Sequence, residues 1–257
     1  MYKICPKCGH ELPAADYSSA QDCPACGLVF TKWLKSLVAE YTEPEAAQIK
    51  QQAPPRSERI LQFFLPPHRY IGRVDFTLYA IIFIVLLFWG AHFISLDFRT
   101  NEIGESFLHN VNLVFHEAGH FLFRPAGRFM TILGGSLFQV LVPLFLVGAF
   151  LWVNKDGFGA AAALWWTGQS LMDLSPYIAD ARALRLPLLG GGTGRDRPGT
   201  HDWANLLRDL GWLNYDTGIA TGVHIFGSGL MIVSFVWGAI MLRIYYRNLV
   251  SAHRLRQ

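Results

Sequence analysis

The chain has 257 residues, of which 52% are hydrophobic and only 16% are charged, and its formal net charge is +3. Together with a positive mean hydropathy, this composition excludes an ordinary water-soluble domain, and we expect no nucleic-acid partner. It predicts an all-α polytopic membrane protein with about five transmembrane helices in a lipid bilayer.

The N-terminal segment contains every cysteine of the chain. The four residues form two C-x-x-C pairs, each followed by glycine: Cys5 and Cys8, then Cys23 and Cys26. Gly9 and Gly27 let backbone amides turn toward the sulfur atoms. The spacing predicts a structural Zn²⁺ with four thiolate ligands and no open position, which would stabilise the fold or bind a protein partner. Residues 1–30 resemble a zinc-ribbon module.

Residues 31–75 are predicted to connect the ribbon to the membrane. Phe30 to Ile49 has the apolar spacing of a helix, and Gln51 to Arg59, with its two prolines, is typical of a linker. Ile60 to Tyr70 is rich in bulky apolar residues and has two prolines. It fits either a segment at the membrane surface or a packed connector.

The main domain is predicted to cover residues 76–243, followed by a basic C-terminal tail over residues 244–257. Its apolar segments are each about long enough for a hydrocarbon core of roughly 30 Å. These predicted spans are Phe76 to Ser95, Phe107 to Phe123, Met130 to Val153, Phe158 to Ile178 and Ile219 to Ile240. In the third span, Gly134, Gly135 and Gln139 are expected to permit close helix packing.

The distribution of basic residues predicts a cytoplasmic N-terminus and zinc ribbon. Seven of them lie between the zinc ribbon and the first span: Lys32, Lys35, Lys50, Arg56, Arg59, Arg69 and Arg73. Five spans would then place the Arg182 to Arg208 loop in the cytoplasm and the Asp97 to Glu105 loop outside. The basic tail would also lie outside, which contradicts the rule. Either one span is miscounted or one segment is re-entrant.

The second predicted span contains His116-Glu117-Ala118-Gly119-His120, an H-E-x-x-H motif. In a helix the two histidines share one face and can hold one zinc ion, while Glu117 is placed to act as general base. A charged side chain at mid-bilayer costs about 3 kcal/mol, which favours a functional role over a polar seam between helices. Asn112, on the same face, would steady a substrate carbonyl or bond a neighbouring helix.

A catalytic zinc site normally has three protein ligands and one open position. Asp173 and Asp180 lie at the end of the fourth predicted span, at the same depth as the histidines. They are separated by about 10 Å along a continuous helix. One of them is therefore expected to bind the metal and the other to support or cap it.

At these residues, over roughly Phe107 to Leu184, the chain resembles the site-2-type intramembrane metalloproteases. In that family H-E-x-x-H is followed two helices later by N-x-x-P and L-D-G, whose aspartate is the third ligand. Asp173-Leu-Ser-Pro176 and Ala179-Asp180-Ala181 stand at the corresponding positions. The resemblance implies that Asp180 is the third ligand, with Asp173 as the alternative. It also implies a zinc metalloendopeptidase acting on membrane-protein or membrane-proximal peptide substrates.

A last polar group, His201-Asp202-Trp203, follows the glycine-rich stretch Gly190 to Gly194. His201 would complete or gate the site, or His201 or Asp202 would begin a helix through Leu206 and Leu207.

Two other functions fit the same residues. One is a different zinc-dependent membrane hydrolase with the same ligands. The other is a non-catalytic scaffold or zinc sensor that docks partners through its ribbon. For the protease we expect one catalytic and one structural Zn²⁺ per chain.

Overall fold

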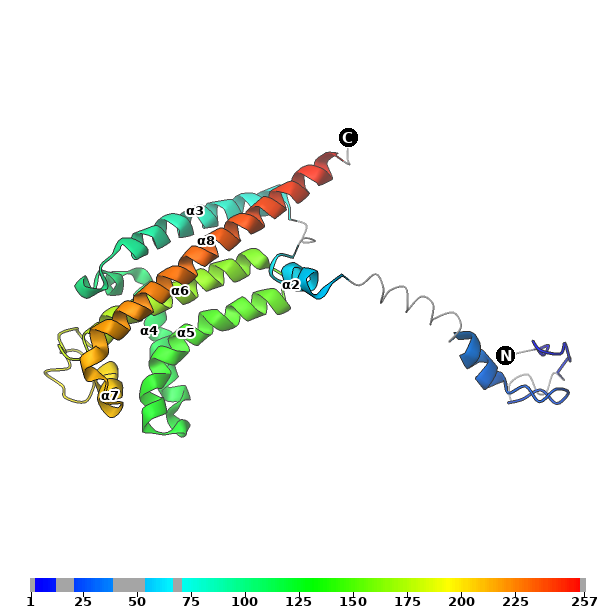
Figure 1. Ribbon diagram of the computed structural model, residues 1–257, viewed down its shortest axis with the longest axis horizontal. Coiled ribbons are helices and arrows are strands. Elements are labelled where there is room, and N and C mark those ends of the chain that lie inside the picture. Colours follow the sequence, from blue (N-terminus) through cyan, green and yellow to red (C-terminus); the bar gives the residue numbers. More distant parts are fainter. Residues whose placement is uncertain (1–2, 13–20, 39–53, 67–70, 255–257) are drawn as a thin grey trace. The chain divides into compact units, whose positions relative to one another are not determined.

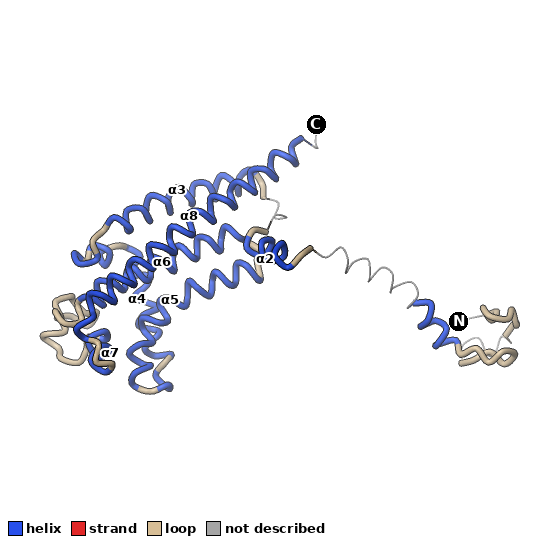
Figure 2. The backbone as a smooth tube through the Cα atoms, viewed as in Figure 1, coloured by secondary structure: helices blue, strands red, loops and turns tan. Residues whose placement is uncertain are grey.

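The computed structural model describes residues 3–12, 21–38, 54–66 and 71–254. They fall into two compact units, Met1–Arg59 and Ile60–Gln257. The described residues form helices and loops and contain no strand (Figure 2), which confirms the predicted all-α class. Residues 51–53 of the predicted linker, residues 67–70 of the connector and the last three residues of the basic tail lie outside the described ranges. The end of the predicted linker is wrong, because a helix already begins at Arg56.

In the first unit, each C-x-x-C pair forms a tight turn. The amide of Gly9 donates to the carbonyl of Cys5 at 2.9 Å, and that of Gly27 donates to the carbonyl of Cys23 at 2.8 Å. Both glycines have a φ near +70°, a conformation that costs glycine little. Residues 30–38 are helical, so the predicted helix is confirmed to residue 38, and its remainder lies outside the described residues.

The second unit is a helical bundle (Figure 1). Its helices are α2 (Arg56–Phe64), which begins in the first unit, α3 (Arg73–Ser95), α4 (Phe107–Leu122), α5 (Arg128–Trp152), α6 (Gly157–Ala179), α7 (Asp202–Asp209) and α8 (Asp216–Arg254). Short 3-10 helices occupy the turns between them: Phe98–Thr100, Glu102–Glu105, Arg124–Ala126 and Leu213–Tyr215.

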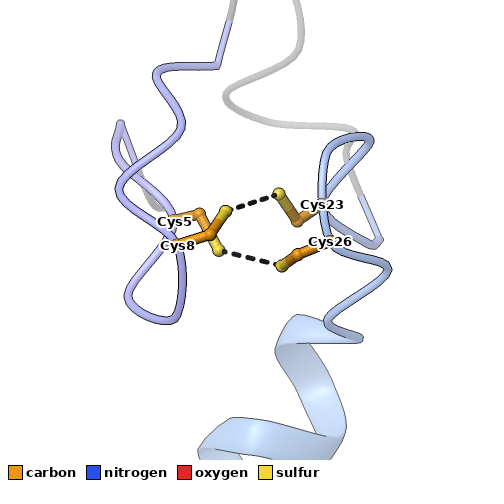
Figure 3. Close-up of side chains that lie close together, drawn as sticks. All are labelled: Cys5, Cys8, Cys23 and Cys26. Carbon is orange, nitrogen blue, oxygen red and sulfur yellow. Dashed lines mark hydrogen bonds between the residues drawn. The ribbon is translucent and has the colours of Figure 1, made fainter.

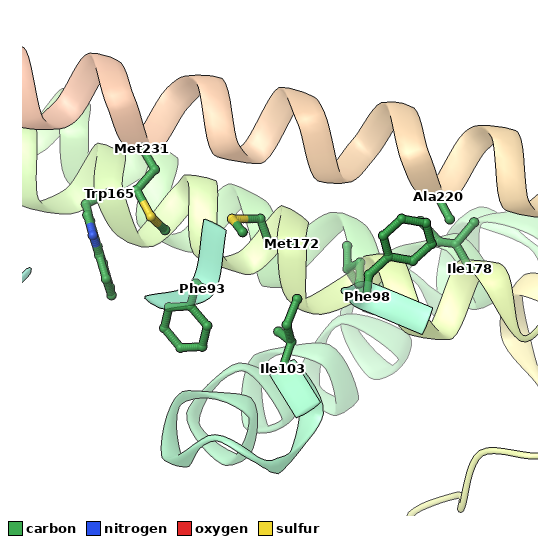
Figure 4. Close-up of a cluster of buried hydrophobic side chains, with 9 residues drawn as sticks. Phe93, Phe98, Ile103, Trp165, Met172, Ile178, Ala220 and Met231 are labelled. Carbon is green, nitrogen blue, oxygen red and sulfur yellow. The ribbon is translucent and has the colours of Figure 1, made fainter. Parts of the chain in front are cut away.

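Helix α6 is the centre of this bundle, because α3, α5 and α8 all pack against it. Gly168 and Gly227 allow α6 and α8 to approach closely: a Cβ atom at Gly168 would lie only 2.6 Å from the carbonyl oxygen of Gly227. The largest buried cluster gathers around α6 (Figure 4). Its members are Phe93, Phe98, Ile103, Trp165, Met172, Leu174, Ile178, Ala220 and Met231.

Large apolar side chains also cover the outside of the bundle. Phe88 of α3, Phe145 of α5 and Val236 of α8 are all more than half exposed. An apolar exterior of this extent fits a lipid environment rather than water. Three helical segments, Arg73–Ser95, Arg128–Trp152 and Leu213–Ser251, are long and apolar enough to cross a membrane. This is consistent with a membrane protein, but five spans are not confirmed.

The other two predicted spans behave differently. Helix α6 has 23 residues, as many as α3, and most of them are buried inside the bundle. It packs against α3, α5 and α8 but is not among the three segments named above. Helix α4 has only 16 residues, about 24 Å of helix, which is short of a hydrocarbon core of about 30 Å.

The segment before α4 and the second half of α4 both lie beside the carboxyl half of α6. Before α4, the ring of Phe98 lies 5.4 Å from that of His224, whose Nδ1 is 3.4 Å from the Ser175 hydroxyl of α6. Farther along α4, the ring of His116 lies 6.2 Å from that of Tyr177, also on α6. The contacts of α4 with α6 thus lie between Trp166 and Tyr177, from the middle of α6 toward its carboxyl end. This geometry favours the re-entrant alternative over a crossing by Phe107 to Phe123.

The start of α3, the start of α6 and the end of α8 meet at the opposite end. The Tyr79 ring stacks on Phe158 at 4.7 Å, and the hydroxyls of Tyr79 and Tyr245 both donate to Asp156. With four crossings, Arg73 and the basic end of α8 lie on one face of the bilayer, which removes the conflict with the charge rule. The loops around Asp97 and Arg195 would then share the other face, whereas the five-span prediction separates them.

This topology predicts which loops share a face. With the ribbon cysteines replaced by serine, the exposed Thr100, Thr200 and Asn154 are each changed to cysteine. The proteins are treated in sealed vesicles with a membrane-impermeant thiol reagent. We expect Thr100→Cys and Thr200→Cys to be labelled from the same side and Asn154→Cys from the other. Five crossings would instead place residues 100 and 200 on opposite sides.

Candidate metal centre

The two histidines of the H-E-x-x-H motif lie side by side on α4, with ring centroids 4.8 Å apart. The Nδ1 of His116 donates to the side-chain oxygen of Gln139 at 3.1 Å, and the Nδ1 of His120 donates to the carbonyl oxygen of Thr131 at 2.8 Å. Because both partners offer oxygen acceptors, each Nδ1 donates to α5, and each Nε2 is the atom that a metal ion would take. Histidines that bind metal ions in proteins are commonly oriented in this way, by a hydrogen bond from the ring nitrogen that does not bind the metal.

The third group at the histidines is Asp202. Its Oδ2 lies 3.2 Å from the Nε2 of His116 and 3.3 Å from that of His120, and the three ligand atoms lie within 4.8 Å of one another. A tetrahedral site with metal–ligand bonds of about 2.1 Å has ligand–ligand distances of about 3.4 Å. The donor set, two imidazoles and one carboxylate, also fits a catalytic zinc ion with an open position.

The N-terminus of α7 holds Asp202 at this point. The Nδ1 of His201 accepts the amide of Ala204 at 3.2 Å as the N-cap of the helix. The amide of Asp202 donates to the Tyr177 hydroxyl at 2.9 Å, and the Trp203 indole donates to Ser136 at 3.1 Å. The prediction that a helix begins at His201 or Asp202 is confirmed.

The charge state of Asp202 also fits a metal ligand. Desolvation raises the pKa of this carboxyl, but hydrogen bonds to His116 and His120 outweigh that effect and lower the pKa to about 2. The group is therefore ionised at neutral pH.

Asp180, the third ligand that the family resemblance implied, has other partners. It follows α6 and accepts the backbone amides of Arg185 and Leu186, each at 2.9 Å. Its Oδ2 also lies 3.4 Å from the Nε2 of His201. Desolvation raises the pKa of Asp180, but the contact with His201 and the two amides lower it overall. The carboxylate thus fastens the loop that leads to α7.

Asp173, the alternative third ligand, is buried between α4, α5 and α6. It accepts from the Nδ1 of His109 at 3.0 Å and from the side-chain amides of Asn112 and Gln139, each at 3.1 Å. Gln139 stands between it and His116. The structure therefore brings Asp202 to the histidine pair and brings neither Asp180 nor Asp173 there.

The accessory residues can also be placed. The amide nitrogen of Asn112 donates to Gln169 at 2.8 Å, and its oxygen accepts the indole N–H of Trp166 at 2.9 Å. This is the helix-to-helix role that was one of its two alternatives. His201 caps α7 rather than joining the ligand set. Glu117 follows His116 on α4, and its side chain is exposed.

The sequence offered only a weak signal for Asp202. Asp202 lies outside the segments that were predicted to span the membrane. The only sequence signal for it was that an acidic residue follows a histidine where a helix was expected to begin. The role of Gln139 was also missed. Gly134 does permit close packing, since a Cβ atom there would lie 2.8 Å from the carbonyl oxygen of Gly119. Gly135 leaves room for the ligands, because its Cβ would lie 2.7 Å from the Nε2 of His116.

The second candidate metal site is formed by the cysteines (Figure 3). The Sγ atoms of Cys5 and Cys26 are 3.7 Å apart, as are those of Cys8 and Cys23, and none of the four is in a disulfide. Tetrahedral zinc–sulfur bonds of about 2.3 Å require sulfur–sulfur distances of about 3.8 Å. The four thiols can therefore hold one metal ion without rearrangement.

The site predicts which aspartate is needed for metal binding. In Asp202→Ala the centre at His116 and His120 should lose its metal, because only two protein ligands remain. Asp180→Asn should retain the metal, since its carboxylate holds a loop. Asp196→Asn, in the same loop and bonded to Thr193, is the matched control. Elemental analysis of the purified proteins measures the metal. Loss in Asp180→Asn with retention in Asp202→Ala would make Asp180 the ligand.

Comparison with known proteins identifies no relative. No family model, no curated protein and no solved structure matches the chain. Its function must therefore be inferred from its own residues.

Proposed function

We propose that this protein is a zinc metalloendopeptidase of the membrane, as its resemblance to site-2-type proteases implies, with Asp202 as the third zinc ligand. The observation that carries the proposal is the convergence of His116 Nε2, His120 Nε2 and the Asp202 carboxylate on one point. Both Nδ1 atoms are held by acceptors from α5, so the two imidazoles are already in the form that binds metal.

The proposed reaction is hydrolysis of a peptide bond. His116, His120 and Asp202 would hold a zinc ion, which would supply an activated water by lowering its pKa toward about 7. Glu117 takes a proton from the attacking water and passes it to the leaving amine. Its position beside His116, with its side chain exposed, suits a group that must reach both water and substrate.

The position of Glu117 also favours an enzyme over a scaffold or sensor. Within the described part of the chain, no hydrogen bond or ion pair involves its side chain. A polar seam between helices would need such a partner, because an ionised group at an apolar surface is costly without one. A base at a metal centre needs none in the resting state.

The depth of the site indicates the kind of substrate. Tyr177, which contacts both His116 and Asp202, lies three residues from the Asp180 cap of α6. The centre is thus at the end of the bundle rather than at its middle. A helix inside the bilayer has its amides bonded and its carbonyls shielded. We therefore propose that the substrate is an extended, membrane-proximal segment of a polypeptide.

The role of Glu117 can be tested directly. Glu117→Gln should keep both metals but lose activity by at least about 100-fold, since general-base catalysis contributes 10²–10⁴-fold. Wild-type and variant proteins are reconstituted with membrane polypeptides, and the cleavage products are compared. Glu102→Gln, an exposed acid outside the site, is the control. Identical polypeptide profiles for wild type and Glu117→Gln would remove the support for proteolysis and leave another hydrolase reaction.

Metal removal should separate the two sites, because they belong to different compact units. The double variant Cys5→Ser/Cys8→Ser should lose the ribbon metal alone, and His116→Ala should lose only the other. Zinc content per purified chain distinguishes the cases. A protein whose zinc content does not respond to His116→Ala would have no metal centre in the membrane unit.

A further inference from the structure

We propose that Asp173 and Gln139 form a positioning relay that fixes the tautomer and direction of His116, although neither residue binds the metal. The inference rests on the proposed metal centre. The relay runs from the Asp173 carboxylate through the Gln139 amide to the Nδ1 of His116, across α6, α5 and α4. The Gln139 and Asp173 residues are only 3% and 5% exposed, so water does not compete for these hydrogen bonds.

The first step is the orientation of the Gln139 amide. Its nitrogen donates to the carbonyl oxygen of Ser170 at 3.3 Å and to the Oδ2 of Asp173 at 3.1 Å. Both of these partners can only accept, so they fix which end of the amide is the NH₂ group. The amide oxygen must then face His116, which it does at 3.1 Å. His116 consequently donates from Nδ1 and directs Nε2 at Asp202 and the proposed metal position.

The second step is the role of Asp173. Its two oxygens accept from three donors, the Nδ1 of His109 and the amides of Asn112 and Gln139. An ionised carboxylate can only accept hydrogen bonds, so the group of Gln139 that faces Asp173 must be the NH₂ group. Because hydrogen bonds in a low-dielectric interior polarise one another, the carboxylate also strengthens the Gln139 contact to His116.

The two histidines are therefore held by different means. His120 is held by the main-chain carbonyl of Thr131 on α5. A side-chain substitution cannot reverse the direction of that carbonyl. His116 depends on a side-chain amide, which would be free to turn over if its partners were removed. The relay supplies the constraint that the backbone supplies to His120.

The main test compares two buried glutamines. Gln139→Met keeps the length of the side chain and removes the contact to His116. Gln169→Met is the matched control, because Gln169 is also buried and bonds Asn112 but not the histidine. Zinc affinity at the membrane site is measured on the purified full-length protein by competition with a chelator, with the ribbon metal as internal reference. We expect about 10–100-fold weaker binding in Gln139→Met and unchanged binding in Gln169→Met.

A second pair of variants separates a positioning role from ligation. Asp173→Ala should weaken zinc binding as Gln139→Met does. Asp173→Asn should restore it to within a few-fold, because the new amide oxygen accepts from Gln139 while its NH₂ faces His109, which can adopt the other tautomer. If Asp173 were a ligand, the asparagine would be as damaging as Asp202→Asn.

The outcomes are distinct. A wild-type protein that binds zinc only at the ribbon overturns the proposed function. A wild-type protein that binds zinc at both sites, with equal affinity in Gln139→Met, overturns the relay alone. Should Gln139→Met fail to fold, as judged by helix content and ribbon zinc, Gln139→Asn is used instead. Its amide keeps the site polar but is one methylene too short to reach His116, so the same weakening is expected, and unchanged affinity again overturns the relay.

Discussion

The close contact between α4 and α5 is the constraint on which the metal centre depends. Gly119 and Gly134 face each other so closely that neither position has room for a methyl group. This approach brings the backbone at Gly135 against the two ligating nitrogens and brings Thr131 and Gln139 within reach of the other ring nitrogens. Small residues allow such contacts between membrane helices, and here they also determine the geometry of two side chains on α4.

His109, Asn112, His116 and His120 form a polar stripe along α4. This polar stripe shows how an apolar bundle accommodates polar groups. Burial without a hydrogen-bond partner is costly in hydrocarbon. His109 and Asn112 find their partners on α6, and His116 finds its partner on α5. The stripe therefore has two functions: its first half joins helices, and its second half directs two Nε2 atoms at the Asp202 carboxylate. The same residue pattern supports both stability and chemistry.

The sequence was sufficient to identify those metal ligands that lie close to one another along the chain. The C-x-x-C pairs and the H-E-x-x-H motif are local, so their spacing alone places the donor atoms together. Asp202 lies more than eighty residues beyond the histidines, and only the packing of α7 on α5 and α6 brings it back. Hydropathy likewise identified α4 as an apolar helix. It could not show that α4 contacts α6 between Trp166 and Tyr177, toward the carboxyl end of α6.

The two ends of α6 have a consequence for the surrounding lipid. Asp156, at one end, and Tyr177, beside the metal centre, are separated by about 32 Å of helix, close to the thickness of a typical hydrocarbon core. The depth of the centre is therefore a matter of hydrophobic matching. A bilayer with shorter acyl chains would move His120 and Asp202 into the headgroup region, and one with longer chains would draw them below it. If α6 crosses the bilayer, membrane thickness as well as protein sequence would determine how much water reaches the histidines.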